Sequence, residues 1–536
     1  MGNVRILDCT LRDGGYINNW NFGKDAIDFT LKKLVESNID IIEVGFIKGD
    51  VFDENRTVYP DCESIREVIA PKSPKTQYVG MVDMSAPVPL ERIPERTDAD
   101  VDLIRVIFKQ DKLQNGLEYI SRIKEKGYLV MAQLVSTDTY TDEELIDAIK
   151  QLNRIGPYAV YLVDSLGIIK NNEFLRLIYL MDHHLAQDII LGYHSHNNLQ
   201  QAMGNAVSFV NMNLRRDIII DACIFGMGRG AGNLNEELFA EYLNETRGTN
   251  YVIEPLLEAI DEYLGDISKT NFWGYSLPFY LTAKNRVHPN YGKYYNAKAT
   301  LTEKAFDDLL KTIAPEDTHI YSAAKAEKYY LDFMKKPYDD RANLEKLSAA
   351  IKGKPVIVFC PGSTLRTHKG MISETIANTP DSVKIAVAFD PEYFDVDYVF
   401  CCNMKRYKGV KKTKKPLIIT SNISTDPADG TYILQYSSFI SSGSLTYDNA
   451  GLMALNFVIS LEPSKIYIAG MDGYTDMSQL DANRDVSDSD DYYVGEFNSQ
   501  MRKEIQELRR KAELSFITPS IYEEERIEGK DRFIGP

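Results

Sequence analysis

The sequence predicts an α/β protein: an N-terminal TIM (β/α)8 barrel with a helical extension, then a smaller C-terminal Rossmann-like α/β domain. Short apolar runs alternate with amphipathic helical stretches through about residue 225, the pattern of parallel strands joined by helices. A second alternation of this kind begins at residue 355. With 536 residues the chain is too long for one ordinary core. We therefore expect a barrel over residues 1–300, an extension and linker over 301–353, and the second domain over 354–536.

Eight apolar runs support the barrel, and helical stretches separate them. The runs cover residues 4–9, 39–44, 77–82, 101–108, 129–135, 159–163, 189–194 and 218–224. The helical stretches include residues 26–37, 117–126, 142–153 and 173–184. In such a barrel the catalytic groups stand at the carboxyl ends of the strands.

The remaining elements follow in order. Residues 236–347 are mostly helical in pattern, and we interpret them as an extension on or beside the barrel mouth. A charged stretch at 335–354 marks the boundary, and strand-like runs follow at 355–359, 382–389, 398–402, 416–420 and 465–469. The acidic segment 487–493 is expected to be a mobile loop before a charged helix around 499–514.

Composition excludes several classes of function. The formal net charge of -17 argues against a nucleic-acid partner, since phosphate backbones demand a basic face. No apolar run approaches membrane-spanning length. The first residues pass straight into a strand-like run, so no signal peptide is expected. The six cysteines are scattered, which favours a reduced, cytoplasmic compartment. We also expect a homo-oligomer.

Three segments far apart in the chain predict one metal site. They are residues 11–15 after the first run, His194 and His196 at the end of the seventh, and the glycine-rich segment 226–233. Residues two apart in a strand point to the same side, so both imidazoles can face one ion. A carboxylate and two imidazoles are a common ligand set for a divalent ion that keeps positions open for substrate.

These motifs resemble the barrel metallolyases that share an arginine–aspartate opening. That group includes 4-hydroxy-2-oxoacid aldolases, hydroxymethylglutaryl-CoA lyase, and the isopropylmalate and homocitrate synthases. The resemblance covers roughly residues 1–300, and its motifs, at 6–15, 43–45, 194–198 and 226–233, occur in the order of the family.

The resemblance implies specific roles. Mn²⁺ or Mg²⁺ would be bound by Asp13, His194 and His196, with Asn233 as a further oxygen ligand. Arg12 would add positive charge to stabilise an enolate, and Glu43 would support Arg12. The backbone at Gly14, Gly228 and Gly230 would lie close to the substrate. The substrates would be a 2-oxoacid such as pyruvate and an aldehyde or sugar.

One departure from the aldolase pattern concerns the catalytic base. Where the aldolases carry a histidine after the arginine–aspartate–glycine unit, this chain has Tyr16. A tyrosine with its ordinary pKa near 10 is a poor base unless the metal or Arg12 lowers that value. Either Tyr16 is tuned, or another residue such as His288 or Tyr291 serves, or the reaction differs.

The second domain more loosely resembles a bacterial Rossmann-like group that contains sialyltransferases and motility-associated proteins. The resemblance covers roughly residues 354–480 and begins at a small-residue turn after a strand, a place where backbone N–H groups can meet phosphate. It implies a nucleotide or nucleotide-sugar site formed by Gly362, Ser363, Thr364, Asn403, Ser442 and Asp472. The lysine-rich run 405–415 either neutralises a diphosphate or is a solvated loop.

The predicted function is a divalent-metal-dependent aldolase that acts through a 2-oxoacid enolate, with a role in the biosynthesis of a bacterial surface polysaccharide. A Claisen condensation with an acyl-CoA is the nearest alternative. A non-catalytic scaffold that docks a partner protein through its helical extension is another. A third is a glycosyl- or nucleotidyl-transfer activity in the second domain.

Overall fold

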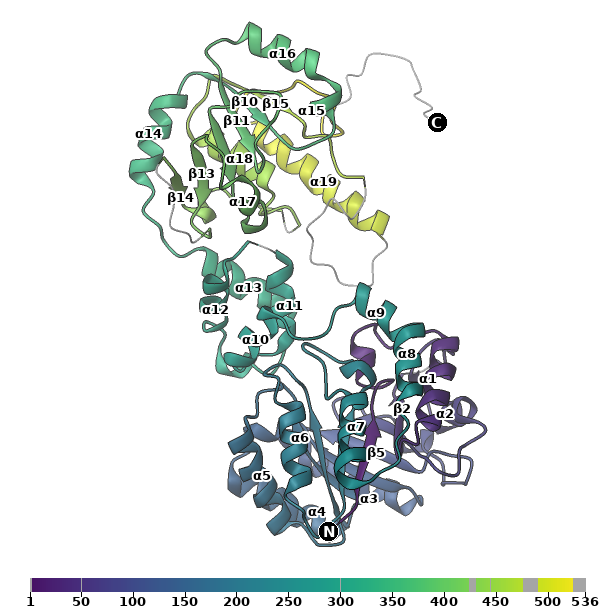
Figure 1. Cartoon of the computed structure of the whole chain (residues 1–536). Coiled ribbons are helices and arrows are strands. Elements are labelled where there is room, and N and C mark those ends of the chain that lie inside the picture. Colours follow the sequence, from purple (N-terminus) through teal and green to yellow (C-terminus); the bar gives the residue numbers. More distant parts are fainter. Residues whose placement is uncertain are drawn as a thin grey trace. The chain divides into compact units, whose positions relative to one another are not determined.

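The computed structural model describes residues 2–49, 51–298, 300–423, 430–443, 445–475 and 490–523 (Figure 1). Packing divides the chain into two compact units. Unit 1 comprises Met1–Lys293 and Pro315–Ile320, and unit 2 comprises Tyr294–Ala314 and Tyr321–Pro536. The predicted limits at residues 300 and 353 differ from this division, because part of the helical extension packs with each unit.

Unit 1 is a closed barrel of eight parallel strands. The order is β1-β9-β8-β7-β6-β5-β4-β2, and pairing of β1 with β2 closes it. The strands are β1 (Val4–Asp8), β2 (Ile41–Ile47), β4 (Gln77–Asp83), β5 (Leu103–Phe108), β6 (Leu129–Leu134), β7 (Ala159–Asp164), β8 (Ile190–Ser195) and β9 (Ile218–Ala222). The short strand β3 (Val58–Tyr59) pairs with the end of β2. All eight predicted strands, and the TIM barrel, are confirmed.

The strands form where the sequence is continuously apolar, because strands of a barrel are covered on both faces. Every residue of β2, β7, β8 and β9 is buried. Charged side chains break this apolar interior; among them, Glu43, Arg105 and Asp221 are at most 2% exposed. Buried charges of this kind must be paired, and they prove to lie beside the candidate site.

Helices surround the barrel in the predicted alternation (Figure 1). They are α1 (Lys24–Glu36), α2 (Cys62–Ile69), α3 (Leu113–Glu125), α4 (Asp142–Ile155), α5 (Asn171–His184), α6 (Ala202–Asn211) and α7 (Glu236–Arg247). The start of α4 shows why these stretches are helical: Thr141 and Glu144 form a reciprocal capping box that satisfies two exposed backbone N–H groups.

The predicted helical pattern between residues 236 and 347 is confirmed. After α7 come α8 (Glu254–Ala259), α9 (Gly265–Thr270), α10 (Leu277–Lys284), α11 (Pro289–Lys298), α12 (Glu303–Leu310), α13 (Ala323–Met334) and α14 (Arg341–Ile351). The connection between α10 and α11 belongs to unit 1 and carries His288.

Unit 2 contains a seven-stranded sheet in the order β14-β13-β12-β11-β10-β15-β16, and all of its pairs are parallel. The strands are β10 (Pro355–Phe359), β11 (Val383–Val387), β12 (Tyr398–Cys401), β13 (Leu417–Thr420), β14 (Tyr432–Leu434), β15 (Lys465–Ala469) and β16 (Leu514–Phe516). The helices are α15 (Thr364–Thr367), α16 (Lys369–Asn378), α17 (Met404–Val410), α18 (Ala450–Ser460) and α19 (Asp490–Arg509). The strand order reverses direction between β10 and β15, the place where open α/β sheets bind ligands.

The sequence predictions for unit 2 were right for five strands and wrong in two places. The strands β14 and β16 were not predicted, because each has only three residues. The charged helix begins at Asp490, inside the predicted loop, and ends at Arg509 rather than near 514. Residues 487–489 of that loop lie outside the described residues. Within the described parts of the chain, we find no helix whose length and hydropathy would allow it to cross a bilayer.

Candidate metal centre at the carboxyl ends of the barrel strands

A carboxylate and two imidazoles meet at the mouth of the barrel. Asp13 follows β1, His194 lies in β8, and His196 comes directly after it. The two histidines are two positions apart in extended chain, so their side chains leave on the same side. Asn233 joins them because its backbone forms an isolated antiparallel bridge with His196. The structure thus brings together all four predicted ligands.

The ligand atoms form a compact, buried group. One nitrogen or oxygen atom of each of Asp13, His194 and His196 lies within 4.8 Å of the others. Nε2 of His194 is 3.9 Å from Oδ1 of Asp13, and Nδ1 of His196 is 3.9 Å from Oδ2. These distances are too long for hydrogen bonds. They suit donors that surround one cation at about 2.1 Å each.

Polar atoms left without partners support the fit of a cation. Within the described residues, Nδ1 of His196 and Oδ1 of Asn233 are buried and have no hydrogen-bond partner. Such atoms are rare in folded proteins and costly to leave unsatisfied. The amide nitrogen of Asn233 donates to Oδ2 of Asp13 over 2.7 Å, which holds the side chain beside the carboxylate. The donor set of two oxygens and two imidazole nitrogens fits a divalent ion.

The protonation states also suit metal binding. Burial would raise the pKa of the Asp13 carboxyl, but the Arg12 guanidinium lowers it well below its usual range. Burial lowers the pKa of His196 to about 3, against the attraction of the Asp13 carboxylate and with help from the Arg229 charge. The site therefore presents an ionised carboxylate and a neutral imidazole at neutral pH, the forms that bind metal.

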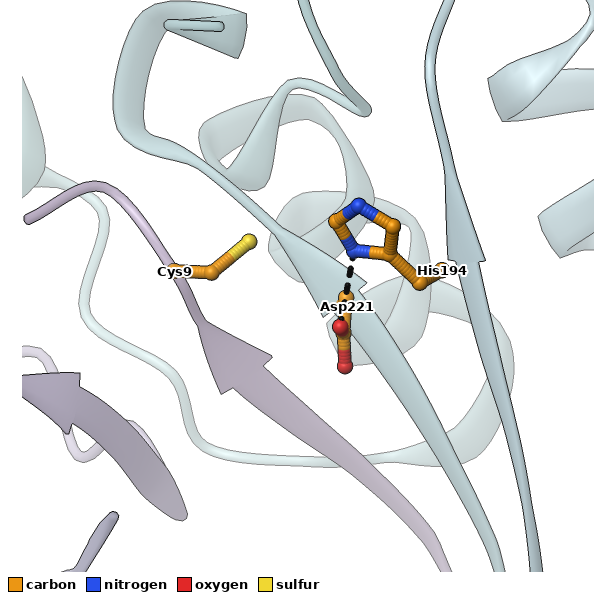
Figure 2. A group of neighbouring side chains, drawn as sticks. All are labelled: Cys9, His194 and Asp221. Carbon is orange, nitrogen blue, oxygen red and sulfur yellow. Dashed lines mark hydrogen bonds and ion pairs between the residues drawn. The ribbon is translucent and has the colours of Figure 1, made fainter. Parts of the chain in front are cut away.

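Cys9 and Asp221 form a second buried group with His194 (Figure 2). Nδ1 of His194 is 2.9 Å from Oδ2 of Asp221, and this contact leaves Nε2 for the Asp13 side. Arg105 donates to both oxygens of Asp221. Burial raises the pKa of the Cys9 thiol well above its usual value, and its sulfur lies 3.3 Å from that of Cys223. We therefore interpret this group as a support that orients His194, as carboxylates do for metal-binding histidines.

Arg12 is held beside the centre by two acids. Its guanidinium donates to Oε2 of Glu43 and to Oδ1 of Asp13. The same oxygen of Glu43 accepts a longer contact, 3.3 Å, from Arg105. The Nη2 atom of Arg12 is buried and, within the described residues, has no hydrogen-bond partner. The Nη2 edge of the guanidinium can therefore donate a hydrogen bond to an oxygen atom of a ligand.

The predicted substrate glycines allow close packing around the centre. A Cβ atom on Gly228 would come within 2.5 Å of the Asn233 amide nitrogen. Gly230 has φ +70°, and a Cβ atom there would come within 2.5 Å of Oδ1 of Asn198. Gly14 packs against a methionine side chain. These positions keep the segments beside the ligands close together; a contact with substrate stays a prediction.

The candidates for the base lie in different environments. Tyr16 is 36% exposed, yet desolvation by the surrounding protein raises the pKa of its hydroxyl. A tyrosine that acts as a base needs a lowered pKa, so this shift is in the opposite direction. Tyr291 is fully buried, and its hydroxyl donates to the backbone oxygen of Ile320 over 3.3 Å.

His288 lies closer to the centre than its place in the sequence implies. Its Nε2 is 3.3 Å from Nη1 of Arg229, and that guanidinium stands 4.7 Å from the centre of the Tyr16 ring. The backbone N–H of Asn290 approaches Nδ1 over 3.2 Å. A neutral ring accepts at only one nitrogen, so these two contacts are alternatives. Burial and the Arg229 charge lower the pKa of His288 well below its ordinary value, so the ring is neutral at pH 7.

In unit 2 the structure brings together four of the six predicted nucleotide-site residues. The carboxylate of Asp472 accepts from the Thr364 N–H over 2.9 Å and from the Ser363 hydroxyl over 3.0 Å. A Cβ atom on Gly362 would come within 2.6 Å of this carboxylate. The protein's own anion thus occupies the turn where a phosphate was expected. The other two residues have structural partners.

Those two residues are Asn403 and Ser442. Asn403 caps α17 by accepting from the N–H of Arg406, and Ser442 donates to Glu504 over 2.7 Å. The lysine-rich run forms α17 and the turn after it. Nucleotide binding in unit 2 stays a prediction.

Sequence reasoning missed three residues of the centre: Asp221, Arg105 and Arg229. Two of them carried a signal. Asp221 is a carboxylate within the apolar run of β9, and Arg105 is a guanidinium within the apolar run of β5. A charge in a strand that is buried on both faces must find a partner inside the barrel.

The sequence of unit 1 is similar to that of known proteins. Residues 3–259 match the family described as HMGL-like, so the N-terminal part of the chain is an HMGL-like domain. The chain is 23% identical over 271 residues to the 4-hydroxy-2-oxovalerate aldolase of Geobacillus genomosp. 3, covering 48% of this chain and 78% of the relative. It is 26% identical over 234 residues to the oxaloacetate decarboxylase of Mycobacterium tuberculosis, covering 43% and 67%.

Among solved structures, the HMG-CoA lyase of Brucella melitensis matches with 18% identity, a TM-score of 0.39, and coverage of 50% of this chain and 99% of the lyase. An N-terminal domain from Bacteroides vulgatus matches with 24% identity, a TM-score of 0.47, and coverage of 55% and 96%.

Proposed function

We propose that unit 1 is a divalent-metal-dependent aldolase that acts on a 2-oxoacid through its enolate. The observation that supports this most is the convergence of Asp13, His194 and His196 within 4.8 Å beside the Arg12 guanidinium. Relatives named 4-hydroxy-2-oxovalerate aldolase and oxaloacetate decarboxylase make or break carbon–carbon bonds next to a keto group. The shared demand of such reactions is stabilisation of negative charge on a keto oxygen.

Asp13, His194, His196 and Asn233 would hold Mn²⁺ or Mg²⁺. When bound, the ion supplies Lewis-acid polarisation of the substrate's keto oxygen. Arg12 then adds a positive charge whose position is fixed by Glu43, so no reorganisation is needed as charge develops. The Nη2 atom of Arg12, which has no partner within the described residues, is the donor we assign to a substrate oxygen.

We assign the proton transfer to His288 rather than to Tyr16. His288 is neutral because burial and Arg229 lower its pKa, whereas the raised pKa of Tyr16 keeps its hydroxyl protonated. A substrate carboxylate paired with Arg229 would offset the guanidinium charge and bring the pKa of His288 back towards neutrality. The ring of Tyr16 lies under the same guanidinium, and its protonated hydroxyl would act as a hydrogen-bond donor rather than as a base.

The test is release of pyruvate from 4-hydroxy-2-oxoacids by the purified chain, measured with a coupled dehydrogenase. The metal-depleted protein should be inactive, and Mn²⁺ or Mg²⁺ should restore turnover. Turnover at an undiminished rate after complete metal removal would contradict the proposal.

Decarboxylation of oxaloacetate is a second candidate. This reaction needs the same stabilisation of negative charge, but it needs no base that acts on a substrate hydroxyl. It is therefore compatible with Tyr16 at the position where the aldolases carry a histidine. The same pyruvate assay with oxaloacetate as substrate separates the two reactions. A higher kcat/KM for oxaloacetate than for any 4-hydroxy-2-oxoacid would favour decarboxylation.

The finer assignments remain proposals. A Claisen reaction would release a thiol from acetyl-CoA in the presence of a 2-oxoacid, and a scaffold would retain a partner protein without turnover.

A nucleotide or nucleotide-sugar at Gly362–Thr364 of unit 2 would have to displace Asp472. Thermal shifts with CMP, UDP and their sugars, compared between the native chain and Asp472→Asn, test this site. A role in surface polysaccharide biosynthesis depends on that outcome.

A further inference from the structure

A cavity of about 290 Å³ opens beside the carboxyl ends of β5 and β6 in unit 1. Its walls come from residues 109–111 after β5, from Val135, Ser136 and Thr139 after β6, and from the segment 315–320. The carboxyl ends of the strands are the face on which barrels of this kind hold their substrates. The volume suits a small molecule rather than a water cluster.

His288 connects this cavity with the metal centre. Its backbone N–H donates to the oxygen of Thr318 over 2.7 Å, in the segment that forms one cavity wall. Its side chain meets Arg229 on the other side. The charges of His196, Lys109 and His319 all act on the His288 ring. The imidazole is therefore close enough to a metal ligand and to two residues of the cavity wall for their charges to act on it.

The lining is chemically mixed. Lys109, Ser136, Thr139 and His319 supply donors and acceptors, and Val135 and Ile320 supply apolar surface. The ammonium group of Lys109 and the hydroxyls of Ser136 and Thr139 can form hydrogen bonds with the hydroxyls of a ligand. An alkyl chain would offer these groups no partner.

We propose that this cavity is the acceptor subsite of the aldolase and that it takes the hydroxylated chain of an aldose-type aldehyde of roughly three to six carbons. The inference rests on the proposed function. In the direction of synthesis, a carbon–carbon bond forms between the methyl carbon of the 2-oxoacid and the aldehyde carbon, and the carbonyl π bond breaks. The proton lost by the methyl group is balanced by the proton that the new hydroxyl gains. The reaction needs no oxidant or reductant.

The experiment compares aldehydes that differ in hydroxylation. Condensation with pyruvate and Mn²⁺ is measured for acetaldehyde, propanal, glyceraldehyde and erythrose. We expect kcat/KM for glyceraldehyde and erythrose to exceed that for the alkyl aldehydes by at least about tenfold, because the polar lining is satisfied only by hydroxyl groups.

Two variants locate the effect. Lys109→Met should lower kcat/KM for erythrose about tenfold and leave that for acetaldehyde unchanged. Ile320→Trp should narrow the cavity and exclude erythrose before acetaldehyde. The matched control is Lys112→Met: this lysine is also exposed, lies on the same short helical turn and does not line the cavity. Lys112→Met should change kcat/KM neither for erythrose nor for acetaldehyde.

The acceptor subsite and the aldolase activity on which it depends are tested separately by metal-dependent exchange of the pyruvate methyl protons with deuterium. Exchange without any preference for hydroxylated aldehydes, or equal effects of Lys109→Met on both aldehyde classes, would overturn the acceptor subsite and leave the aldolase proposal intact. Absence of exchange would overturn the aldolase. Even then, saturation-transfer NMR of erythrose with the native chain and with Ile320→Trp decides whether the cavity binds a hydroxylated chain.

Discussion

The guanidinium of Arg229 lies between Tyr16 and His288, 4.7 Å from the tyrosine ring centre and 3.3 Å from the histidine Nε2. One charge therefore acts on both residues that could move a proton. Burial raises the pKa of Tyr16 against this charge, and burial together with this charge lowers the pKa of His288. The tyrosine stays protonated and the histidine stays neutral, which assigns them opposite roles.

The first prediction concerns the base. His288→Gln should lower kcat/KM roughly 10²- to 10⁴-fold, whereas Tyr16→Phe should lower it less than about tenfold. A base works only when deprotonated, so kcat/KM of the native chain, which reports the pKa of the free enzyme, should fall as pH falls. Because the pKa of His288 is lowered, this fall should begin below the ordinary value of about 6.5. A rate that rises only near pH 10 and is lost in Tyr16→Phe would reverse the assignment.

The second prediction concerns the metal carboxylate. Asp13→Asn removes the one anionic ligand of the group and should abolish metal-stimulated pyruvate release, with a loss of at least about 10³-fold in kcat. Mn²⁺ binding, measured by calorimetry, should weaken in parallel. Asp25→Asn, an exposed carboxylate on α1, is the control and should leave both measurements unchanged. Full Mn²⁺ affinity in Asp13→Asn would show that the ion binds elsewhere.

The third prediction concerns the support of His194. Asp221→Asn should weaken Mn²⁺ binding roughly 10- to 100-fold. It should also lower the free energy of unfolding by about 3–5 kcal/mol, since the buried Arg105 loses the closer of its two carboxylate partners and keeps only the 3.3 Å contact with Glu43. Calorimetry and urea titration measure the two effects. Asp182→Asn, which weakens an aspartate–arginine pair with Arg216, should leave Mn²⁺ affinity unchanged.

The fourth prediction concerns Arg12. Arg12→Lys keeps one positive charge but loses the planar fork that bridges Glu43 and Asp13. We expect kcat to fall roughly 10²- to 10³-fold while Mn²⁺ affinity changes less than about threefold. Steady-state kinetics at saturating Mn²⁺ tests this, with the exposed Arg122→Lys as control. Equal losses in kcat and in metal affinity would mean that Arg12 acts by holding Asp13 and not by meeting the substrate.

Local patterns explain which features could be predicted. The barrel strands are predictable because each is a continuous apolar run, and the ligands because His194 and His196 share one side of a strand end. The contact of His288 with Arg229 was not predictable. His288 lies in the connection between α10 and α11, Arg229 lies in a loop 59 positions earlier, and no local sequence pattern links the two. The same holds for the cavity, whose third wall comes from residues 315–320. The turn at Gly362–Thr364 was recognised, but nothing in its sequence indicated that Asp472 would fill it.

The match to the HMGL-like family ends at residue 259, whereas His288 and the cavity wall at 315–320 come later in the chain. In the proposed mechanism, cation binding and proton acceptance are thus encoded by separate stretches of sequence. A change in the later stretch could alter the choice of reaction partner without disturbing the residues assigned to the ion. Related chains with the same barrel and a different continuation should accordingly share a first substrate and diverge in the second.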